Sequence, residues 1–138
     1  MQFENVIGQS ATKKHLIDLV QHNRLSHALL FLGKEGSCSL AMALAFSQYI
    51  VCNSAKNDKP KLAGLFEEEK IITPKVLEPL DSCGHCPSCI KAEQFIHPDI
   101  HFSFPVIPKK AGSPPPVSND YMNEWRKFIT SVPEILLI

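Results

Sequence analysis

The hydrophobic and polar positions of the chain fall into blocks that predict strands and helices. Residues 28–32 are continuously apolar and end at Gly33, which predicts a strand buried on both faces. Residues 39–51 carry apolar side chains around most of a helical circumference, which predicts a buried helix. Gly33 and Gly36 mark the loop between the two. This stretch therefore predicts a strand, a loop and a helix in succession.

Further helices are predicted on both sides of this stretch. Ser10 or Thr12 is expected to cap a helix that ends near residue 23 and has an apolar face made of Leu16, Leu19 and Val20. Pro87 fits the first turn of a helix that extends to about Ile96. Ser118 is expected to cap a last helix, whose apolar stripe consists of Tyr121, Trp125, Phe128 and Val132.

Residues 100–106 alternate between apolar and other side chains, as a half-exposed strand does. Strands that alternate with helices predict an α/β fold. The length of 138 residues, 44% of them hydrophobic, fits a single domain or a part of a larger one, here taken as 1–138.

The loop after the first predicted strand lies where a phosphate-binding loop would lie. In the motif G-x-x-x-x-G-K-[ST], backbone N–H groups surround the phosphates, the Lys reaches the β and γ phosphates, and the hydroxyl binds Mg²⁺. With the first glycine set on Gly33, the three chemical positions fall on Cys38, Ser39 and Leu40.

These three residues do not suit the motif. A Cβ at Cys38 keeps the backbone away from phosphate, Ser39 carries no charge, and Leu40 cannot bind a metal ion. We therefore expect no productive use of ATP at this loop. Gly33 and Gly36 fit equally well as turn residues of any α/β protein.

Four cysteines form the strongest local motif. Cys83, Cys86 and Cys89 recur at intervals of three, and Cys52, at the end of the predicted buried helix, can supply a fourth thiolate. Four thiolates make a closed tetrahedral zinc site, which is structural because it leaves no position for water. An iron–sulfur cluster and metal-free buried thiols are the alternatives. His85 is expected to be part of the turn and not a ligand.

Two segments interrupt the predicted elements. Residues 53–82 form an insertion within a predicted zinc module at 52–90, with Leu62, Leu65 and Phe66 as the apolar face of a short helix. Residues 105–117 form a Pro-rich linker of extended character. The Lys109–Lys110 pair within that linker is a weak footprint for DNA phosphate.

The composition of the chain argues against some classes of function, namely binding to nucleic acid or membranes through overall charge and spanning a membrane. The chain has 14 basic and 14 acidic side chains, so its formal charge is zero and no overall field attracts nucleic acid or membrane. No apolar run approaches the roughly 20 residues that cross a bilayer, and the N-terminus lacks a signal peptide pattern. We expect a soluble cytoplasmic protein without a membrane partner, in which the cysteines are reduced.

The order of the motifs resembles the start of bacterial DNA polymerase III clamp-loader subunits of the AAA+ class. The similar parts are Phe3–Gln9, a helix, Arg24–Phe31, the glycine loop, a helix that ends at Cys52, and the segments Cys83–Cys89 and His97–Phe102. The resemblance implies a partial RecA-like domain of parallel strands flanked by helices, with an inserted four-cysteine zinc module. It also implies that the chain is an N-terminal fragment.

Within this family, the degenerate loop resembles that of the delta-prime subunits. The resemblance then implies a non-hydrolysing subunit that assembles with the ATPase subunits (gamma/tau) and with delta, and that meets the sliding clamp and primed DNA through the assembled complex. Two alternatives remain: an active gamma/tau-type ATPase, which lacks its Lys at Ser39, and a zinc-dependent nucleic-acid-binding module, for which Lys91 is the nearby basic residue.

Overall fold

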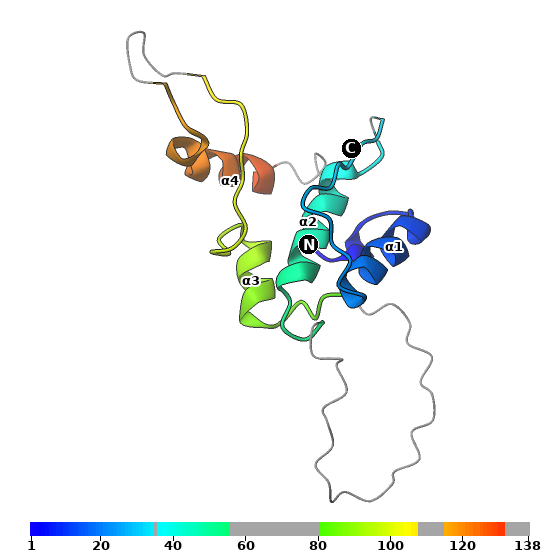
Figure 1. Cartoon of the computed structure of the whole chain (residues 1–138). Coiled ribbons are helices and arrows are strands. Elements are labelled where there is room, and N and C mark those ends of the chain that lie inside the picture. The colour runs from blue at the N-terminus through cyan, green and yellow to red at the C-terminus, as the bar shows by residue number, and fades with distance from the viewer. Residues whose placement is uncertain (35, 56–80, 108–114, 132–138) are drawn as a thin grey trace, which may run out of the picture.

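The computed structural model describes residues 1–34, 36–55, 81–107 and 115–131. Within these ranges the chain forms two 3-10 helices and four α-helices, which are η1 (Phe3–Asn5), α1 (Ser10–Gln21), α2 (Ser39–Val51), α3 (Pro87–Glu93), η2 (Ser118–Tyr121) and α4 (Met122–Ser131). Helix α2 lies between α1 and α3 and packs against both (Figure 1). The helix predicted around Leu62 and Leu65, the Lys109–Lys110 pair and Val132 lie outside the described residues.

Helix α2 forms the centre of the hydrophobic core. Its buried side chains pack against buried residues of α1 and of the N-terminal residues, and the core consists of Phe3, Val6, Leu16, Ile17, Cys38, Ala41, Met42, Ala45, Phe46 and Tyr49. The ring of Phe3 lies 6.5 Å from that of Phe46 and 5.8 Å from that of Tyr49. Each large apolar side chain buried in this way stabilises the fold by about 1.5–3 kcal/mol.

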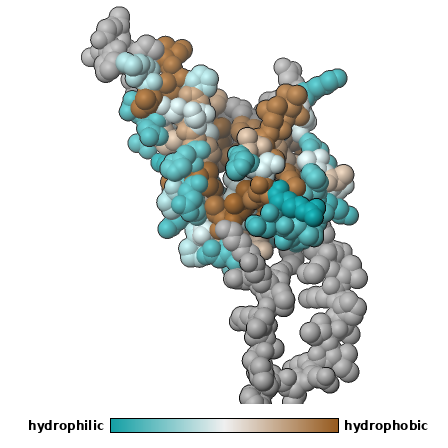
Figure 2. Space-filling view, in the orientation of Figure 1, coloured by the Kyte–Doolittle hydropathy of each residue, from teal (hydrophilic) through white to brown (hydrophobic). Residues whose placement is uncertain are grey.

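The predicted α/β fold, and with it the partial RecA-like domain of parallel strands, is wrong for the part of the chain that the structure describes. No residue there belongs to a strand. Residues 28–32 pass over α2 as an irregular segment, with Leu30 85% and Leu32 87% exposed. Figure 2 shows apolar surface over this part of the molecule. An apolar run becomes a strand only when another strand pairs with its backbone, and no such partner lies among the described residues.

The second predicted strand, residues 100–106, is also irregular. Its alternation persists in burial, since Phe102 and Phe104 are half-buried and His101 and Ser103 are exposed. The hydroxyl of Ser118 donates to the Phe104 carbonyl at 2.9 Å and accepts from the Phe104 N–H at 3.1 Å. A side chain therefore satisfies the backbone groups that a neighbouring strand would pair, and Ser118 does not cap the last helix as predicted.

The predicted helices are mostly confirmed, and their ends differ. Helix α2 has the predicted bounds, and α3 starts at Pro87 but ends at Glu93. Helix α1 starts at Ser10, yet its N-cap is Gln9 and no side chain caps it. Among the helices that the structure describes, none has both the length and the apolar composition needed to cross a membrane.

Candidate metal centre

Cys52, Cys83, Cys86 and Cys89 come together where α2 ends and α3 begins. Cys52 is the C-cap of α2, Cys86 is the N-cap of α3, and Cys89 lies in the first turn of α3. Cys83 belongs to the turn before α3, and we call Cys83–Cys89 the knuckle. The packing of α2 against α3 therefore brings a distant cysteine to the three that are close in sequence.

The four sulfur atoms lie within 4.8 Å of one another. The Sγ of Cys83 lies 3.6 Å from that of Cys52 and 3.9 Å from that of Cys89. In a tetrahedral site with zinc–sulfur bonds of about 2.3 Å, neighbouring sulfurs are about 3.8 Å apart. All four cysteines are free thiols. The donor set and its spacing fit a four-coordinate metal ion.

Backbone N–H groups point at three of these sulfurs. The N–H of Cys83 donates to the Sγ of Cys52, that of Cys86 to the Sγ of Cys83, and that of Cys89 to the Sγ of Cys86, each at 3.4 Å. Hydrogen bonds of this kind stabilise negative charge on sulfur. For Cys83 and Cys86 the turn therefore favours the thiolate form that binds metals.

The thiol pKa values follow these contacts. A hydrogen bond from the Ser54 side chain, helped by the backbone N–H groups of His85 and Cys86, lowers the pKa of Cys83 to about 5. For Cys86, burial raises the pKa, but the backbone N–H groups of Cys89 and Asn53 outweigh it and the net shift is downward. Burial raises the pKa of Cys89, which is fully buried, well above its usual range.

His85, inside the knuckle, and His97, which follows α3, each form a hydrogen bond with a nearby backbone group. Nδ1 of the exposed His85 donates to the Cys83 carbonyl at 2.6 Å, and His85 lies outside the sulfur cluster. Nδ1 of the buried His97 accepts from the Asp99 N–H at 3.1 Å.

The sequence reasoning missed the residues that support the knuckle. Gln48 is buried in α2, and its Nε2 donates to Ser82 Oγ at 3.1 Å. Gln2 donates to the Ser82 carbonyl, and Asp81 accepts from backbone N–H groups of the N-terminal residues. Gln48, a polar residue in a mainly apolar helix, was the signal in the sequence that pointed to these supporting contacts.

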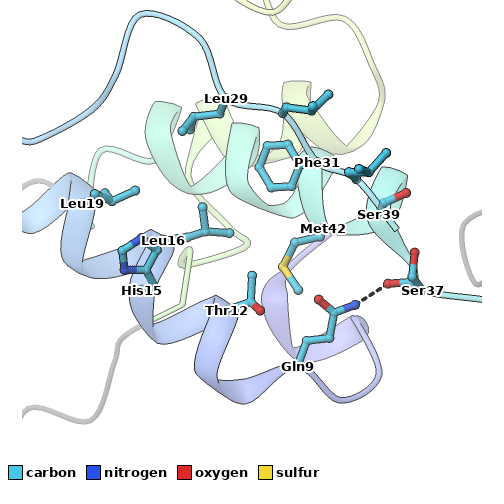
Figure 3. Close-up of a pocket in the computed structure, with 12 residues that line it drawn as sticks. Gln9, Thr12, His15, Leu16, Leu19, Leu29, Phe31, Ser37, Ser39 and Met42 are labelled. Carbon is cyan, nitrogen blue, oxygen red and sulfur yellow. Dashed lines mark hydrogen bonds between the residues drawn. The ribbon is translucent and has the colours of Figure 1, made fainter. Parts of the chain in front are cut away.

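The glycine loop forms the turn before α2. Gly33 and Gly36 are exposed, Cys38 is buried in the core, Ser39 is half-buried and Leu40 is exposed. Cys38 has a φ of +54°, a backbone conformation that favours glycine. An open groove of about 310 Å³ lies beside the loop, and α1, residues 29–32 and the start of α2 line it (Figure 3).

Gln9 Nε2, at the N-cap of α1, donates a hydrogen bond to the Ser37 carbonyl and so ties the loop to the start of that helix (Figure 3). The groove is mainly apolar, with Leu16, Phe31 and Met42 among its walls. The expectation that this loop makes no productive use of ATP stays a prediction.

Comparison with known proteins adds one match. Residues 8–65 match the family model described as "DNA polymerase III, delta subunit", which covers α1, the glycine loop, α2 and Cys52. No curated protein and no solved structure matches the chain significantly. The match supports a relationship to the DNA polymerase III clamp-loader subunits, without distinguishing delta-prime from the others.

Proposed function

We propose that this chain is a non-hydrolysing clamp-loader subunit of the DNA polymerase III holoenzyme, of the delta-prime type. It helps to assemble the complex that places the sliding clamp on primed DNA. The observation that carries this proposal is the family match over residues 8–65, which includes a phosphate loop without its chemical residues. The chain would act in the cytoplasm beside the gamma/tau ATPase subunits and delta, and would meet clamp and DNA through them.

The loop geometry supports the non-hydrolysing assignment. The side chain of Cys38 is buried in the core, and Ser39 stands where the motif has a Lys. Leu40 carries no oxygen that could bind Mg²⁺. No group at these three positions neutralises the charge that develops during phosphoryl transfer.

Calorimetric titration of Mg-ATP into the full-length protein tests this part. We expect no heat of binding and no phosphate release. Mixed with the ATPase and delta subunits of the same cell, the protein should still elute with them as one complex on size exclusion. Tight binding with turnover would favour the gamma/tau-type ATPase, and failure to join the complex would remove the clamp-loader assignment.

The four-cysteine cluster is proposed as a structural zinc site with Cys52, Cys83, Cys86 and Cys89 as its ligands. Support comes from the sulfur spacing, from the closed all-sulfur donor set and from the full burial of Cys52 and Cys89. The role is structural because the site joins the end of α2 to the start of α3. Residues 52–90 would then form one zinc module with the insertion 53–82 between its ligands.

Metal analysis of the purified protein tests the zinc site. We expect one zinc ion per chain and no visible absorbance, whereas an iron–sulfur cluster would be coloured. Cys86→Ser should lose the ion. Cys38→Ala is the matched control, since Cys38 is the one cysteine outside the cluster and its loss should leave the zinc in place. A wild-type protein without metal would contradict the proposal.

A further inference from the structure

The N-terminal segment (Met1–Val6) lies directly on the residues that precede the knuckle. The side-chain amide of Gln2 donates from Nε2 to the carbonyl of Ser82, across 80 positions of sequence. Gly84 lies under the same amide, because a Cβ at Gly84 would come within 3.1 Å of the Gln2 side chain. Gly84 also has a φ of +72°. A larger residue is therefore disfavoured there both by the contact with Gln2 and by the backbone conformation.

Asp81 makes the second connection between these parts. Its carboxylate accepts from the N–H of Phe3 at 3.1 Å and from that of Glu4 at 2.8 Å, which are free N–H groups at the start of η1. The same carboxylate accepts from the N–H of Ser82 at 2.6 Å. One side chain therefore fixes both the N-terminal segment and the backbone just before Cys83.

Gln48 makes the third connection, from helix α2. Its Nε2 donates to Ser82 Oγ, and its Oε1 accepts from the amino group of Met1 at 2.7 Å. Gln48 lies one helical turn before Cys52 on α2, so it holds Ser82 close to the place where Cys52 meets Cys83. Both polar ends of this buried amide are paired, as burial requires.

We propose that docking of the N-terminal segment and metal binding at the four cysteines are coupled. Gln2, Gln48 and Asp81 act as positioning residues that hold Ser82, and through it Cys83, in place for the metal. Because coupling is reciprocal, the bound metal in turn stabilises the N-terminal segment, whose Phe3 and Val6 belong to the core. This inference rests on the proposed metal centre.

Competition between the full-length protein and a chromogenic chelator for Zn²⁺ measures the first half of the coupling. Gln2→Ala and Asp81→Ala should each weaken zinc binding by about tenfold or more, as loss of groups behind a metal ligand commonly does. Gln21→Ala and Asp18→Ala make the same chemical changes on the exposed surface of α1, and they should bind zinc like the wild type.

Hydrogen exchange of the Phe3 and Glu4 amides measures the other half. Added Zn²⁺ should slow their exchange in the wild type, and Asp81→Ala should abolish this slowing because it removes their acceptor. If Asp81→Ala loses helical content, Gln2→Ala decides, since it leaves that acceptor in place. Equal zinc affinity in Gln2→Ala and wild type would overturn the coupling and keep the metal centre. A wild type that binds no zinc would overturn both.

Discussion

Helices α1 and α3 end with the same pattern of backbone hydrogen bonds, but a different type of residue takes the left-handed conformation at each end. At the end of α1, the N–H of Arg24 donates to the Leu19 carbonyl at 2.8 Å, and Asn23, with a φ of +53°, makes the reversal. At the end of α3, the N–H of Ile96 donates to the Lys91 carbonyl at 2.9 Å, and Phe95 has a φ of +57°. Asparagine tolerates this conformation, whereas phenylalanine is strained in it.

The ring of Phe95 belongs to a cluster of aromatic side chains. The ring lies 5.8 Å from that of Phe102 and 5.6 Å from that of Trp125, both at steep angles. Edge-to-face pairs of this kind contribute about 0.5–1.5 kcal/mol each, which offsets a strain of about 1–2 kcal/mol. The early end of α3, which the sequence pattern placed near Ile96, follows from this long-range contact.

Asparagine-to-alanine substitutions just after α1 and within α4 should change the free energy of unfolding in opposite directions. Asn23→Ala should lower the free energy of unfolding by about 1 kcal/mol, because alanine has no local hydrogen bond to compensate for a positive φ. Asn123 lies in α4, and Asn123→Ala should raise the free energy of unfolding by a few tenths of a kcal/mol, roughly the difference in helix propensity between asparagine and alanine. Urea unfolding followed by circular dichroism measures both changes in the free energy of unfolding. Changes in the same direction would contradict the left-handed conformation of Asn23 at the end of α1.

Gly33 and Ser37 form a second local test. A Cβ at Gly33 would overlap the Ser37 side chain, whose buried Oγ has no hydrogen-bond partner among the described residues. Gly33→Ala should therefore cost about 1–3 kcal/mol of stability. Ser37→Ala should be neutral or stabilising, because it removes an unpaired buried hydroxyl. Adding Ser37→Gly to Gly33→Ala should recover most of the loss, and a fully additive double mutant would contradict this contact.

At the scale of elements, the sequence predicted helices better than extended segments. The positions of α1, α2 and α3 follow from local periodicity and from Pro87. These signals are local in the sequence and do not depend on distant residues. The strands at 28–32 and 100–106 were wrong because pairing depends on distant residues. At Phe104, the Ser118 hydroxyl takes the place of a partner strand, and no pattern within residues 100–106 indicates that.

Helix α4 was predicted correctly as a helix, but its predicted buried face was partly wrong. The predicted stripe contained Phe128, which is 53% exposed, whereas the buried residue of α4 is its neighbour Ile129. Trp125 was placed correctly and stacks on Phe104 at 5.4 Å. The apolar face is therefore rotated by about 100° at this end of the helix.

Alanine substitutions at these two neighbours separate the two faces. Ile129→Ala should cost about 2–4 kcal/mol, because it opens a cavity behind α4. Phe128→Ala should change stability by about 0.5 kcal/mol or less. Trp125 is the one tryptophan of the chain, so its fluorescence during urea unfolding reports on α4. A larger loss for Phe128→Ala would support the stripe predicted from the sequence.

At the scale of the whole molecule, α2 connects the core to the four-cysteine cluster. One end carries the glycine loop, the middle is buried in the core, and the other end presents Cys52 to the knuckle. Helix α3 has only seven residues, which is too short to be stable alone in water. Its stability should therefore depend on what holds the knuckle to α2.

Removal of the metal tests this dependence. Zinc at about 1,000 times its dissociation constant would stabilise the folded state by about 4 kcal/mol, so a chelator should lower the unfolding midpoint and reduce helical circular dichroism. The protein with Cys38→Ala should respond in the same way. Cys86→Ser should show no response to the chelator, and a response as large as the wild type's would exclude the knuckle as the site.

The candidate site was only partly predictable from the sequence. The spacing of Cys83, Cys86 and Cys89 is local and showed the cluster directly, and Cys52 followed from its place at the end of a helix. The supporting contacts of Gln2 and Gln48 join residues 80 and 34 positions apart from Ser82, and pairings over such distances leave no periodic signal.

The meeting of Cys52 and Cys83 has a consequence for the length of the chain between them. Their sulfurs lie 3.6 Å apart although the residues are 31 positions apart, so both ends of the intervening segment are pinned at one place. Doubling the length of a flexible loop with fixed ends costs only about 0.6 kcal/mol of closure entropy. Added length between Ser54 and Asp81 should therefore change the stability of the fold little, provided that Ser54, Asp81 and Ser82 keep their contacts.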